Sequence, residues 1–318
     1  MQKTILITGV AGFIGFHVAN KFLSKNYKII GIDNFCKTYN PKIKKHRVFR
    51  LKKFKNFFFY KLDLNKLDKI KSKKIDFIIH LAAQAGVRAS VENPKFYIRE
   101  NIEKTVSVFE FAKSNKIKKI FYASSSSVYG EINIYPSNEK LIINKPVSIY
   151  GLTKACNEDI AYYYNSIEKI SSIGFRFFTV YGPYGRPDMS INIFFKALIE
   201  NKTIKLFNRG NNYRDYTYVD DIVNQIYLCT VKSKGNFFNI FNIGGEKTIK
   251  LSLLIKLMEK IVKKKTSIKY LPKNRLDPVK SLANNKKIQN YTNYKAKTSL
   301  INGLGKTYDW LKNNIQFC

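Results

Sequence analysis

A glycine-rich turn near the amino end constrains the fold of this chain more than any other feature. Gly9, Gly12 and Gly15 follow residues 3–8, an apolar run typical of a buried strand, and they open residues 13–24, which are typical of a helix. Glycines at this spacing allow a tight turn, a close approach of a ligand to the backbone, and close packing of helix on strand. The sequence therefore predicts a strand, turn and helix whose N-terminus faces the phosphates of a dinucleotide.

Short apolar runs alternate with longer amphipathic stretches over the first part of the chain. This alternation is typical of crossover units in a parallel sheet. Residues 76–81 (DFIIHL) are apolar on both faces, as a sheet covered by helices on both sides requires. Further strands are expected at residues 27–32, 57–62, 77–81, 117–123 and 173–178, and helices at 94–114 and 150–166.

The alternation loosens after about residue 178, where glycines and prolines punctuate residues 182–187. Helices are expected at 220–232, 251–264 and 300–313, with a loop at 271–277. The predicted fold class is α/β, with a doubly wound parallel sheet of the Rossmann type in residues 1–178 and a return segment near 214–242. Residues 179–318 are expected to form mainly a smaller α/β region that binds the substrate.

Asp33 stands at the end of the second predicted strand, 18 residues past Gly15. A carboxylate at this place accepts hydrogen bonds from the ribose hydroxyls of a dinucleotide and repels a 2′-phosphate. The sequence therefore predicts NAD rather than NADP as the cofactor.

Tyr150 and Lys154 form a YxxxK pair, and residues four apart share one face of a helix. An ammonium beside a phenol favours the phenolate, so we expect Lys154 to lower the pKa of Tyr150 and make it a general base. A serine run, Ser124 to Ser127, at the carboxyl end of a predicted strand supports a catalytic role for this pair. Catalytic groups of open parallel sheets gather at that edge.

The net charge of +35 is the one unusual feature of the composition. The lysines are scattered rather than gathered in a binding arm, so we expect no nucleic-acid partner, although a positive field would attract an anionic substrate. No apolar run is long enough to span a membrane. The four cysteines show no close pairing and the three histidines no metal-binding spacing. We therefore expect a cytoplasmic protein with free thiols and no metal.

Several motifs together resemble the extended short-chain dehydrogenases, a family of NAD-dependent epimerases and dehydratases. These are residues 8–15 (TGVAGFIG), 80–84 (HLAAQ), 124–130 (SSSSVYG), 150–154 (YGLTK) and 214–221 (RDYTYVDD). More narrowly, residues 83–88 (AQAGVR), 176–183 (RFFTVYGP) and 185–189 (GRPDM) look like those of UDP-glucuronate 4-epimerases. The resemblance covers nearly the whole chain, with its motifs in order.

The resemblance implies a role for each matching residue. Ser125, Tyr150 and Lys154 would be catalytic, with Lys154 also holding the nicotinamide ribose. The implied cofactor-binding residues are Gly9, Gly12, Phe13, Ile14, Gly15, Asp33, Asn34, Asp63, Leu64, Leu81, Ala82, Ala83, Gln84, Asn101, Tyr150 and Lys154. The implied substrate-binding residues are Arg88, Ser125, Ser126, Ser127, Tyr150, Thr179, Arg186, Arg214 and Asp277. Leu276 departs from the family pattern, which has a glycine there. The family also implies a homodimer.

The expected reaction is the epimerisation of a UDP-hexuronate at C4 through a transient 4-keto sugar. Such a sugar is a β-keto acid that loses CO₂ easily, so an epimerase must hold its carboxylate still. Ser126, Ser127 and Thr179 suit that task because short hydroxyls bind a carboxylate without adding acid chemistry. Arg88 and Arg186 are cationic candidates, each of which could equally form a salt bridge or contact a phosphate.

Other readings remain open at this point. A UDP-glucuronate decarboxylase shares the first oxidation, and a UDP-glucose/UDP-galactose-type 4-epimerase shares the site without the carboxylate. A 4,6-dehydratase is disfavoured, because Ser126 and Ser127 stand where such enzymes carry an Asp-Glu pair. A non-catalytic NAD-binding or nucleic-acid-binding protein is disfavoured by the intact Ser125, Tyr150 and Lys154.

Overall fold

A seven-stranded sheet forms the centre of the molecule. The computed structural model describes residues 2–70, 74–131, 134–141 and 146–317. The strand order in the large sheet is β10-β6-β5-β4-β1-β2-β3, and every neighbouring pair is parallel. The strands are β1 (Thr4–Thr8), β2 (Lys28–Asp33), β3 (Phe57–Lys61), β4 (Phe77–His80), β5 (Lys119–Ser125), β6 (Ser171–Phe177) and β10 (Phe238–Ile243).

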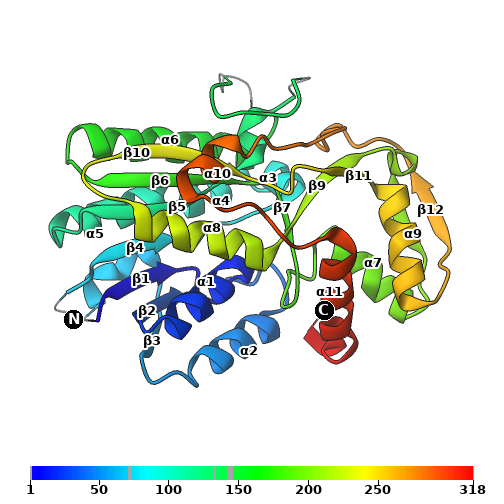
Figure 1. Cartoon of the computed structure of the whole chain (residues 1–318), viewed down its shortest axis with the longest axis horizontal. Helices are drawn as coiled ribbons and strands as arrows, with labels where there is room; N and C mark the ends of the chain where they lie inside the picture. The colour runs from blue at the N-terminus through cyan, green and yellow to red at the C-terminus, as the bar shows by residue number, and fades with distance from the viewer. Residues whose placement is uncertain (1, 71–73, 132–133, 142–145, 318) are drawn as a thin grey trace.

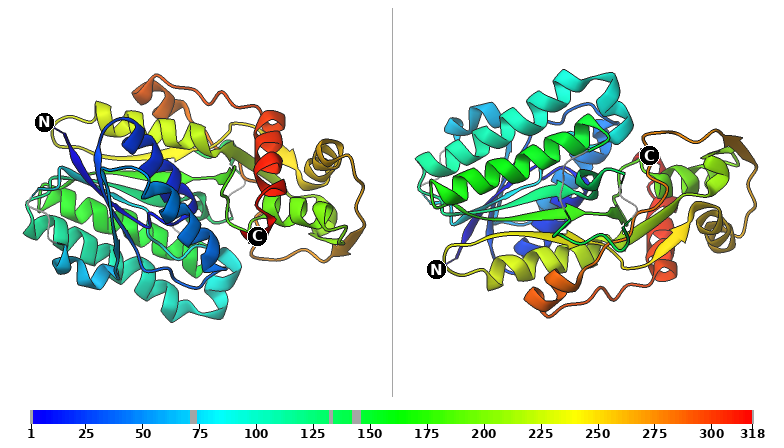
Figure 2. Two further views of the ribbon diagram at one scale, coloured as in Figure 1. Left: turned by 90° about the horizontal axis from the view of Figure 1, so that it is seen from below. Right: turned by 90° about the horizontal axis from the view of Figure 1, so that it is seen from above.

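Helices cover both faces of this sheet, as Figure 2 shows. Ile5 and Ile7 of β1 pack into the core cluster that includes one helical layer, whereas Leu6 between them packs with the other layer. The first layer holds α1 (Phe13–Ser24), α2 (Pro41–Leu51), α8 (Val219–Lys232) and α10 (Lys286–Thr292). The second holds α3 (Val87–Glu92), α4 (Pro94–Ile98), α5 (Lys104–Ser114) and α6 (Ile149–Ser166). The prediction of a doubly wound parallel sheet is confirmed.

The strand order reverses between β1 and β4. The chain proceeds from β1 outward through β2 and β3, and then returns to build β4, β5 and β6 on the other side. Ligands of open α/β sheets bind outside the carboxyl ends of the strands at such a reversal. The glycine-rich turn after β1 and residues 81–84 after β4 meet at this place, since the Leu81 backbone N–H donates to the Thr8 carbonyl.

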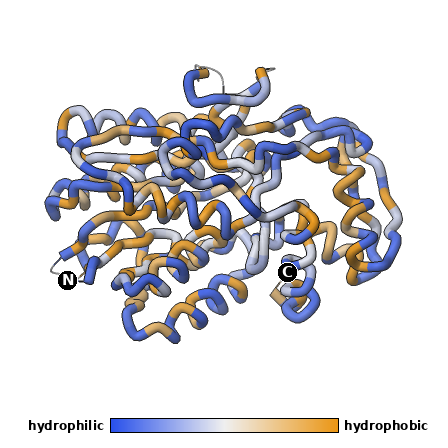
Figure 3. The backbone as a smooth tube through the Cα atoms, in the orientation of Figure 1, coloured by the Kyte–Doolittle hydropathy of each residue, from blue (hydrophilic) through white to orange (hydrophobic). Residues whose placement is uncertain are grey.

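A smaller region lies beyond the carboxyl edge of the large sheet (Figure 1). Its core combines residues of its helices and short strands, and in Figure 3 its helix α9 carries both apolar and polar residues along its length. Its helices are α7 (Ser190–Ile199), α9 (Leu251–Val262) and α11 (Leu300–Lys312). Its strands are β7 (Thr179–Tyr181), β9 (Tyr213–Tyr218) and β11 (Thr248–Lys250) in one sheet, and β8 (Ile204–Phe207) and β12 (Ile268–Leu271) in another.

Two predicted elements differ from those observed. The expected helix at 94–114 is interrupted by a π-helical turn, Arg99–Glu103, between α4 and α5. The strand expected at 117–123 begins and ends two residues later, because Lys116 adopts a left-handed conformation and Ile117 closes a turn onto Ala112. The strand therefore includes Ser124 and Ser125. Among the described residues, none of the helices is long and apolar enough to cross a membrane.

Candidate functional site

The glycine-rich turn forms a cradle that admits no side chains. Gly9 has a φ of 68°, and a Cβ there would lie 2.6 Å from the backbone nitrogen of Ala82. A Cβ on Gly15 would collide with the Gly9 carbonyl. Gly12 is the N-cap of α1 and offers no side-chain acceptor to the first turn, in which Phe13 and Ile14 stand. The first N–H groups of α1 are thus available to an anion, which fits a dinucleotide pyrophosphate.

Asp33 ends β2 beside this cradle. Its carboxylate accepts hydrogen bonds from the backbone N–H groups of Ala11, at 3.1 Å, and Phe35, at 2.8 Å. Burial raises the pKa of the carboxyl group, and the positive charge of Lys44 is the largest of the effects that oppose this rise. The side chain is therefore fixed by the glycine-rich turn, at the place where the sequence predicts a ribose contact.

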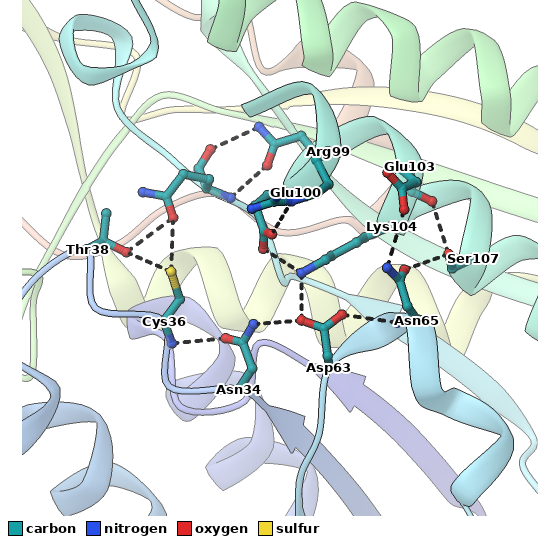
Figure 4. Close-up of polar contacts among 12 residues, drawn as sticks. Asn34, Cys36, Thr38, Asp63, Asn65, Arg99, Glu100, Glu103, Lys104 and Ser107 are labelled. Atoms are coloured by element: carbon teal, nitrogen blue, oxygen red, sulfur yellow. Dashed lines mark hydrogen bonds and ion pairs between the residues drawn. The ribbon is translucent and has the colours of Figure 1, made fainter. Parts of the chain in front are cut away.

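A polar cluster surrounds Asp63, close to Asn34 after the end of β2 (Figure 4). Asn34 donates to the Asp63 carboxylate at 3.1 Å, and Lys104 donates to it at 2.7 Å. Burial acts to raise the pKa of Asp63, but hydrogen bonds from Lys104, Asn65 and Asn34 outweigh it and leave the pKa lowered. Leu64, the next residue, is buried. The structure thus brings Asn34, Asp63 and Leu64 together in a site bearing an ionised carboxylate.

The segment after β4 carries Leu81, Ala82, Ala83 and Gln84, and Asn101 holds it in place. The Asn101 side chain accepts from the Gln84 backbone N–H at 2.7 Å and donates to its carbonyl at 2.9 Å. It also donates to the Thr153 hydroxyl on α6 at 3.0 Å. Asn101 stands in the π-helical turn, which turns its amide inward. These bonds make Asn101 a support for the cleft wall.

The serine run passes from strand into turn at the carboxyl end of β5. The Ser125 hydroxyl accepts from the Ser127 backbone N–H at 3.1 Å and donates to the Ser127 hydroxyl at 3.2 Å. Ser126 and Ser127 line a hollow of about 60 Å³ that Val87 and Leu276 also border. The run therefore presents hydroxyl groups to a cavity between the large sheet and the smaller region.

Tyr150 and Lys154 stand in the first turns of α6, which is capped by Ser148. A Cβ on Gly151 would lie 2.5 Å from the Ser127 carbonyl, so only glycine allows α6 to approach the serine run this closely. The Lys154 ammonium donates to the Ala123 carbonyl at 2.8 Å. Burial lowers the pKa of Lys154 to about 8, and the Glu158 carboxylate opposes that change.

The electrostatics of Tyr150 differ from the prediction. Burial raises the pKa of its phenol, while a hydrogen bond with Ser125 and the positive charge of Arg186 oppose the rise. The predicted lowering by Lys154 is wrong for the arrangement seen here. The pKa of Tyr150 is raised because desolvation dominates at the phenol, while the buried Lys154 ammonium is directed to the Ala123 carbonyl. Arg186 is the cation that acts on Tyr150.

The predicted substrate-binding residues fall into two groups. Thr179 and Arg186 line a second, small hollow of about 10 Å³, together with Phe13 of the glycine-rich turn. Arg186 makes a bidentate contact with Asp188, at 3.0 and 2.6 Å. This group lies next to Tyr150, since Arg186 acts on its phenol.

The second group gathers around the Arg88–Asp277 ion pair. Arg88 and Asp277 form an ion pair, and the Arg88 guanidinium lies 4.2 Å from the ring centre of Phe207. Burial lowers the pKa of Arg214, whose charge also interacts with Asp277 and Arg88. Two guanidinium groups and one carboxylate are thus available to a nucleotide, and the two predicted ligands Arg88 and Asp277 partner each other.

Sequence reasoning missed the residues that hold the site from behind. Glu158, Arg176 and Tyr129 form a buried network beneath the serine run, with Arg176 donating to the Tyr129 hydroxyl at 2.9 Å. Arg47 and His17 contact the loop that carries Arg186. Arg176 and Tyr129 lie within the recognised motifs, whereas Arg47 lies in a lysine-rich stretch whose pattern gives no signal.

Comparison with known proteins places this site in a family. The sequence pattern of the NAD dependent epimerase/dehydratase family matches residues 5–244. The chain belongs to this family. The membership confirms the resemblance expected from the motifs, and NAD, the cofactor that the family description names, fits the glycine cradle and Asp33. In the described part of the chain no group of His, Cys, Asp and Glu side chains could hold a metal ion, and Cys36, Cys156 and Cys229 are free. Cys318 lies outside the described residues.

Individual relatives in this epimerase/dehydratase family cover nearly the same length. A UDP-glucuronate 4-epimerase of Thermodesulfobacterium geofontis is 38% identical over 316 residues, covering 98% of this chain and 97% of that protein. The UDP-glucuronic acid 4-epimerase of Bacillus cereus, solved with UDP-glucuronic acid and NAD, superposes with a TM-score of 0.91 at 33% identity over 98% of this chain and 99% of that one. A UDP-glucose 4-epimerase of Thermotoga maritima, solved with UDP-glucose, superposes at 0.89 with 28% identity and the same two coverages.

Proposed function

We propose that this protein is an NAD-dependent epimerase that interconverts UDP-glucuronate and UDP-galacturonate by inversion at C4. The observation that carries the proposal is the placement of Ser125 and Arg186 around the phenol of Tyr150, beside the glycine cradle. The likeness to the Thermodesulfobacterium and Bacillus cereus enzymes supports the uronate as substrate. The cleft offers cations at both ends, which suits a substrate that carries a diphosphate and a carboxylate.

NAD, when bound, supplies the acceptor and donor of the hydride at C4. Tyr150 takes the proton of the C4 hydroxyl and later returns a proton to the same oxygen. Ser125 donates a hydrogen bond to that oxygen and keeps it within reach of the phenol. Lys154, whose pKa of about 8 leaves it charged at neutral pH, holds the nicotinamide ribose. The positive charge of Arg186 favours the phenolate form of Tyr150 that accepts the proton. The sugar turns between the two transfers, so that the proton and hydride return with inverted configuration.

The cofactor-side residues would hold NAD as the family resemblance implies. The first turn of α1 binds the pyrophosphate through Phe13 and Ile14, and Asp33 binds the adenosine ribose. Asn34, Asp63 and Leu64 flank the adenine. Residues 81–84, supported by Asn101, form the wall opposite the glycine turn.

The substrate-side residues divide between the two ends of the UDP-sugar. Ser126, Ser127, Thr179 and Arg186 hold the sugar carboxylate away from alignment with the C4 carbonyl, which prevents loss of CO₂. Arg214 and Arg88 bind the diphosphate, and Asp277 binds the uridine ribose. Binding at that end exchanges the Arg88–Asp277 ion pair for contacts with the nucleotide. On this proposal residues 1–178 with the return segment 214–242 serve the cofactor, and most of residues 179–318 serve the substrate.

A product analysis tests this function. The purified protein is incubated with UDP-glucuronate, UDP-glucose or UDP-N-acetylglucosamine, and the products are identified by NMR. We expect UDP-galacturonate from the first alone, without build-up of NADH. A UDP-pentose would indicate a decarboxylase, and turnover of UDP-glucose would indicate a neutral-sugar epimerase. Tyr150→Phe is expected to lower kcat by about 10³-fold while NAD binding is retained.

We further propose a cytoplasmic homodimer. Leu152 and Tyr163 are exposed apolar residues on α6, and Ile98 is exposed on the adjacent α4. Positions 152 and 163 are three helical turns apart and share one face, so a second copy could cover them together. The use of a UDP-sugar and the free thiols of Cys36, Cys156 and Cys229 support a place in the cytoplasm.

A further inference from the structure

Consecutive backbone carbonyls of the loop that carries Arg186 accept hydrogen bonds from side chains outside the loop. The Pro183 carbonyl accepts from His17 Nε2 at 2.9 Å. The carbonyls of Tyr184 and Gly185 accept from Arg47 Nη2 at 2.5 and 3.2 Å, and the Arg186 carbonyl accepts from Asn192 at 2.7 Å. Consecutive carbonyls from 183 to 186 are therefore all fixed by side chains outside the loop. His17 and Arg47 come from the cofactor side, on α1 and α2, and Asn192 comes from α7.

Arg47 connects this loop with the glycine-rich turn. Its side chain is 0% exposed, and Nη1 donates to the Ala11 carbonyl at 2.9 Å and to the Tyr39 hydroxyl at 3.1 Å. Within the described part of the chain no carboxylate lies within ion-pair distance of it. The Arg47 charge interacts with the more distant Asp33 carboxylate, and its hydrogen bonds go to backbone carbonyls and the Tyr39 hydroxyl.

The loop adopts a conformation that must be held. Tyr184 has a φ of 58°, the left-handed region that a bulky residue rarely adopts without support. Its ring packs on Phe16 with centroids 4.7 Å apart and on Trp310 at 4.7 Å, and it stacks on His46 at 5.9 Å. Aromatic packing on the outside and the carbonyl contacts on the inside together fix the backbone on which Arg186 stands.

Tyr39 provides a second connection between the two arginines. The Arg47 guanidinium donates to the Tyr39 hydroxyl, and the Arg186 guanidinium lies 5.5 Å from the centre of the same ring. Arg186 also lines the hollow that Thr179 borders. Arg47 thus acts on Arg186 through the loop backbone and through this ring, while Asp188 holds the Arg186 guanidinium directly.

From these contacts we infer that Arg47 and His17 are positioning residues that set the preference of the site for a carboxylate-bearing sugar. They do so by holding the 183–186 backbone, and with it the Arg186 guanidinium, in register with the glycine-rich turn. The inference rests on the proposed function, because it assumes that Arg186 meets the uronate carboxylate. A small displacement of a charge from its ligand weakens binding steeply, whereas a neutral sugar at the same place is little affected.

Binding to the NAD-loaded protein, with Tyr150→Phe present in every variant, tests the inference without turnover. Dissociation constants for UDP-glucuronate and UDP-glucose are measured by calorimetry, and their ratio gives the uronate preference. We expect Arg47→Lys, which keeps the charge but cannot span its acceptors, to reduce this preference about tenfold. His17→Leu should reduce it severalfold, and His17→Gln, whose amide can still donate to the Pro183 carbonyl, should restore it. Arg50→Lys, an exposed change on the same helix, serves as the matched control.

The outcomes separate the inference from the function on which it rests. Arg186→Met should abolish the preference if Arg186 meets the carboxylate. A wild-type protein that neither prefers the uronate nor epimerises it overturns the proposed function, and the inference falls with it. If the wild type shows both properties but Arg47→Lys and His17→Leu keep the full preference, the inference alone is overturned. Should Arg47→Lys fail to fold, the pair of His17 variants decides the matter.

Discussion

Arg176 on β6 and Glu158 on α6 form a buried bidentate ion pair directly behind the candidate site. Arg176 Nη2 lies 2.7 Å from Glu158 Oε2, and Nε lies 2.9 Å from Oε1. The same carboxylate accepts from the Ser124 hydroxyl at 2.5 Å. Glu158 is one helical turn past Lys154, so the pair ties the helix that bears Tyr150 and Lys154 to the strand that leads into the serine run.

Glu158→Gln is expected to destabilise the fold by about 3 kcal/mol, because it leaves the Arg176 charge buried without its counter-ion. Removing that charge as well, in Glu158→Gln with Arg176→Met, should recover part of the loss. Urea unfolding followed by circular dichroism measures both free energies. A single variant within about 1 kcal/mol of the wild type would show that the pair contributes little.

His80 should make the protein less stable as the pH falls. Burial lowers the pKa of its imidazole to about 3, from about 6.5 in an unfolded chain. The unfolded state therefore binds the extra proton first, and stability that is present above pH 6.5 is lost between pH 6.5 and about 3. The loss amounts to about 2 kcal/mol between pH 6.5 and 5.

A matched variant isolates this contribution. The His80 ring is held by the hydroxyls of Thr8, at 2.8 Å, and Thr105, at 3.1 Å, so His80→Asn keeps a polar group there without titrating. Burial raises the pKa of Asp215 to about 6, which acts in the opposite direction over pH 3.8 to 6 but is common to both proteins. Unfolding free energies at pH 7, 6 and 5 should fall less steeply for His80→Asn, and parallel curves would contradict the assignment.

Replacing Ser127 and Thr179 with alanine should increase the loss of CO₂ during turnover. Each change removes a hydroxyl from the site that we propose holds the carboxylate, so the sugar can rotate into the geometry that favours decarboxylation. We expect the ratio of UDP-pentose to UDP-galacturonate to rise about tenfold, as measured by NMR or ion-exchange chromatography. The variant Ser24→Ala, an exposed change at the carboxyl end of α1, should leave the ratio unchanged.

A charge on the exposed face of α6 should separate the proposed dimer. Leu152→Lys with Tyr163→Lys places two ammonium groups on one face, and their repulsion across a twofold interface opposes association. Light scattering should then report one chain, 37.0 kDa, instead of two. The change Val231→Lys, on α8 of the opposite layer, is the control. A wild-type protein that already scatters as one chain would contradict the dimer.

Much of the fold could be predicted because its local signals agree. The glycine turn, the two-faced apolar strands and the helices at 13–24, 220–232 and 300–313 all follow from periodicity, and the structure confirms them within a residue or two. The strand β10 had no comparable signal. Its sequence, FNIFNI, contains two asparagines, which are unusual in a strand of a buried sheet. Asn242 is accommodated there because it accepts a hydrogen bond from the hydroxyl of Tyr129, a residue distant in the chain.

The candidate site was predictable only where a motif fixes it. Tyr150, Lys154 and the serine run come together as expected, although their assigned roles remain predictions. The supports of the site were not predictable, because His17 and Arg47 act through backbone carbonyls more than a hundred residues away in the chain. Such contacts leave no recognisable pattern in the sequence. The direction of the Tyr150 pKa was missed for a related reason, since desolvation depends on packing.

The route of the chain between the two regions limits how relatives could exchange parts. After β6 the chain leaves the large sheet, builds β7, α7, β8 and β9, and then returns with α8 and β10 to cover one face and complete one edge. A gene cut once after codon 178 would separate β6 from its neighbouring strand and α1 from the helix packed against it. A chimera that transplants substrate specificity must therefore be spliced at several junctions, with the 219–243 segment left in its original background.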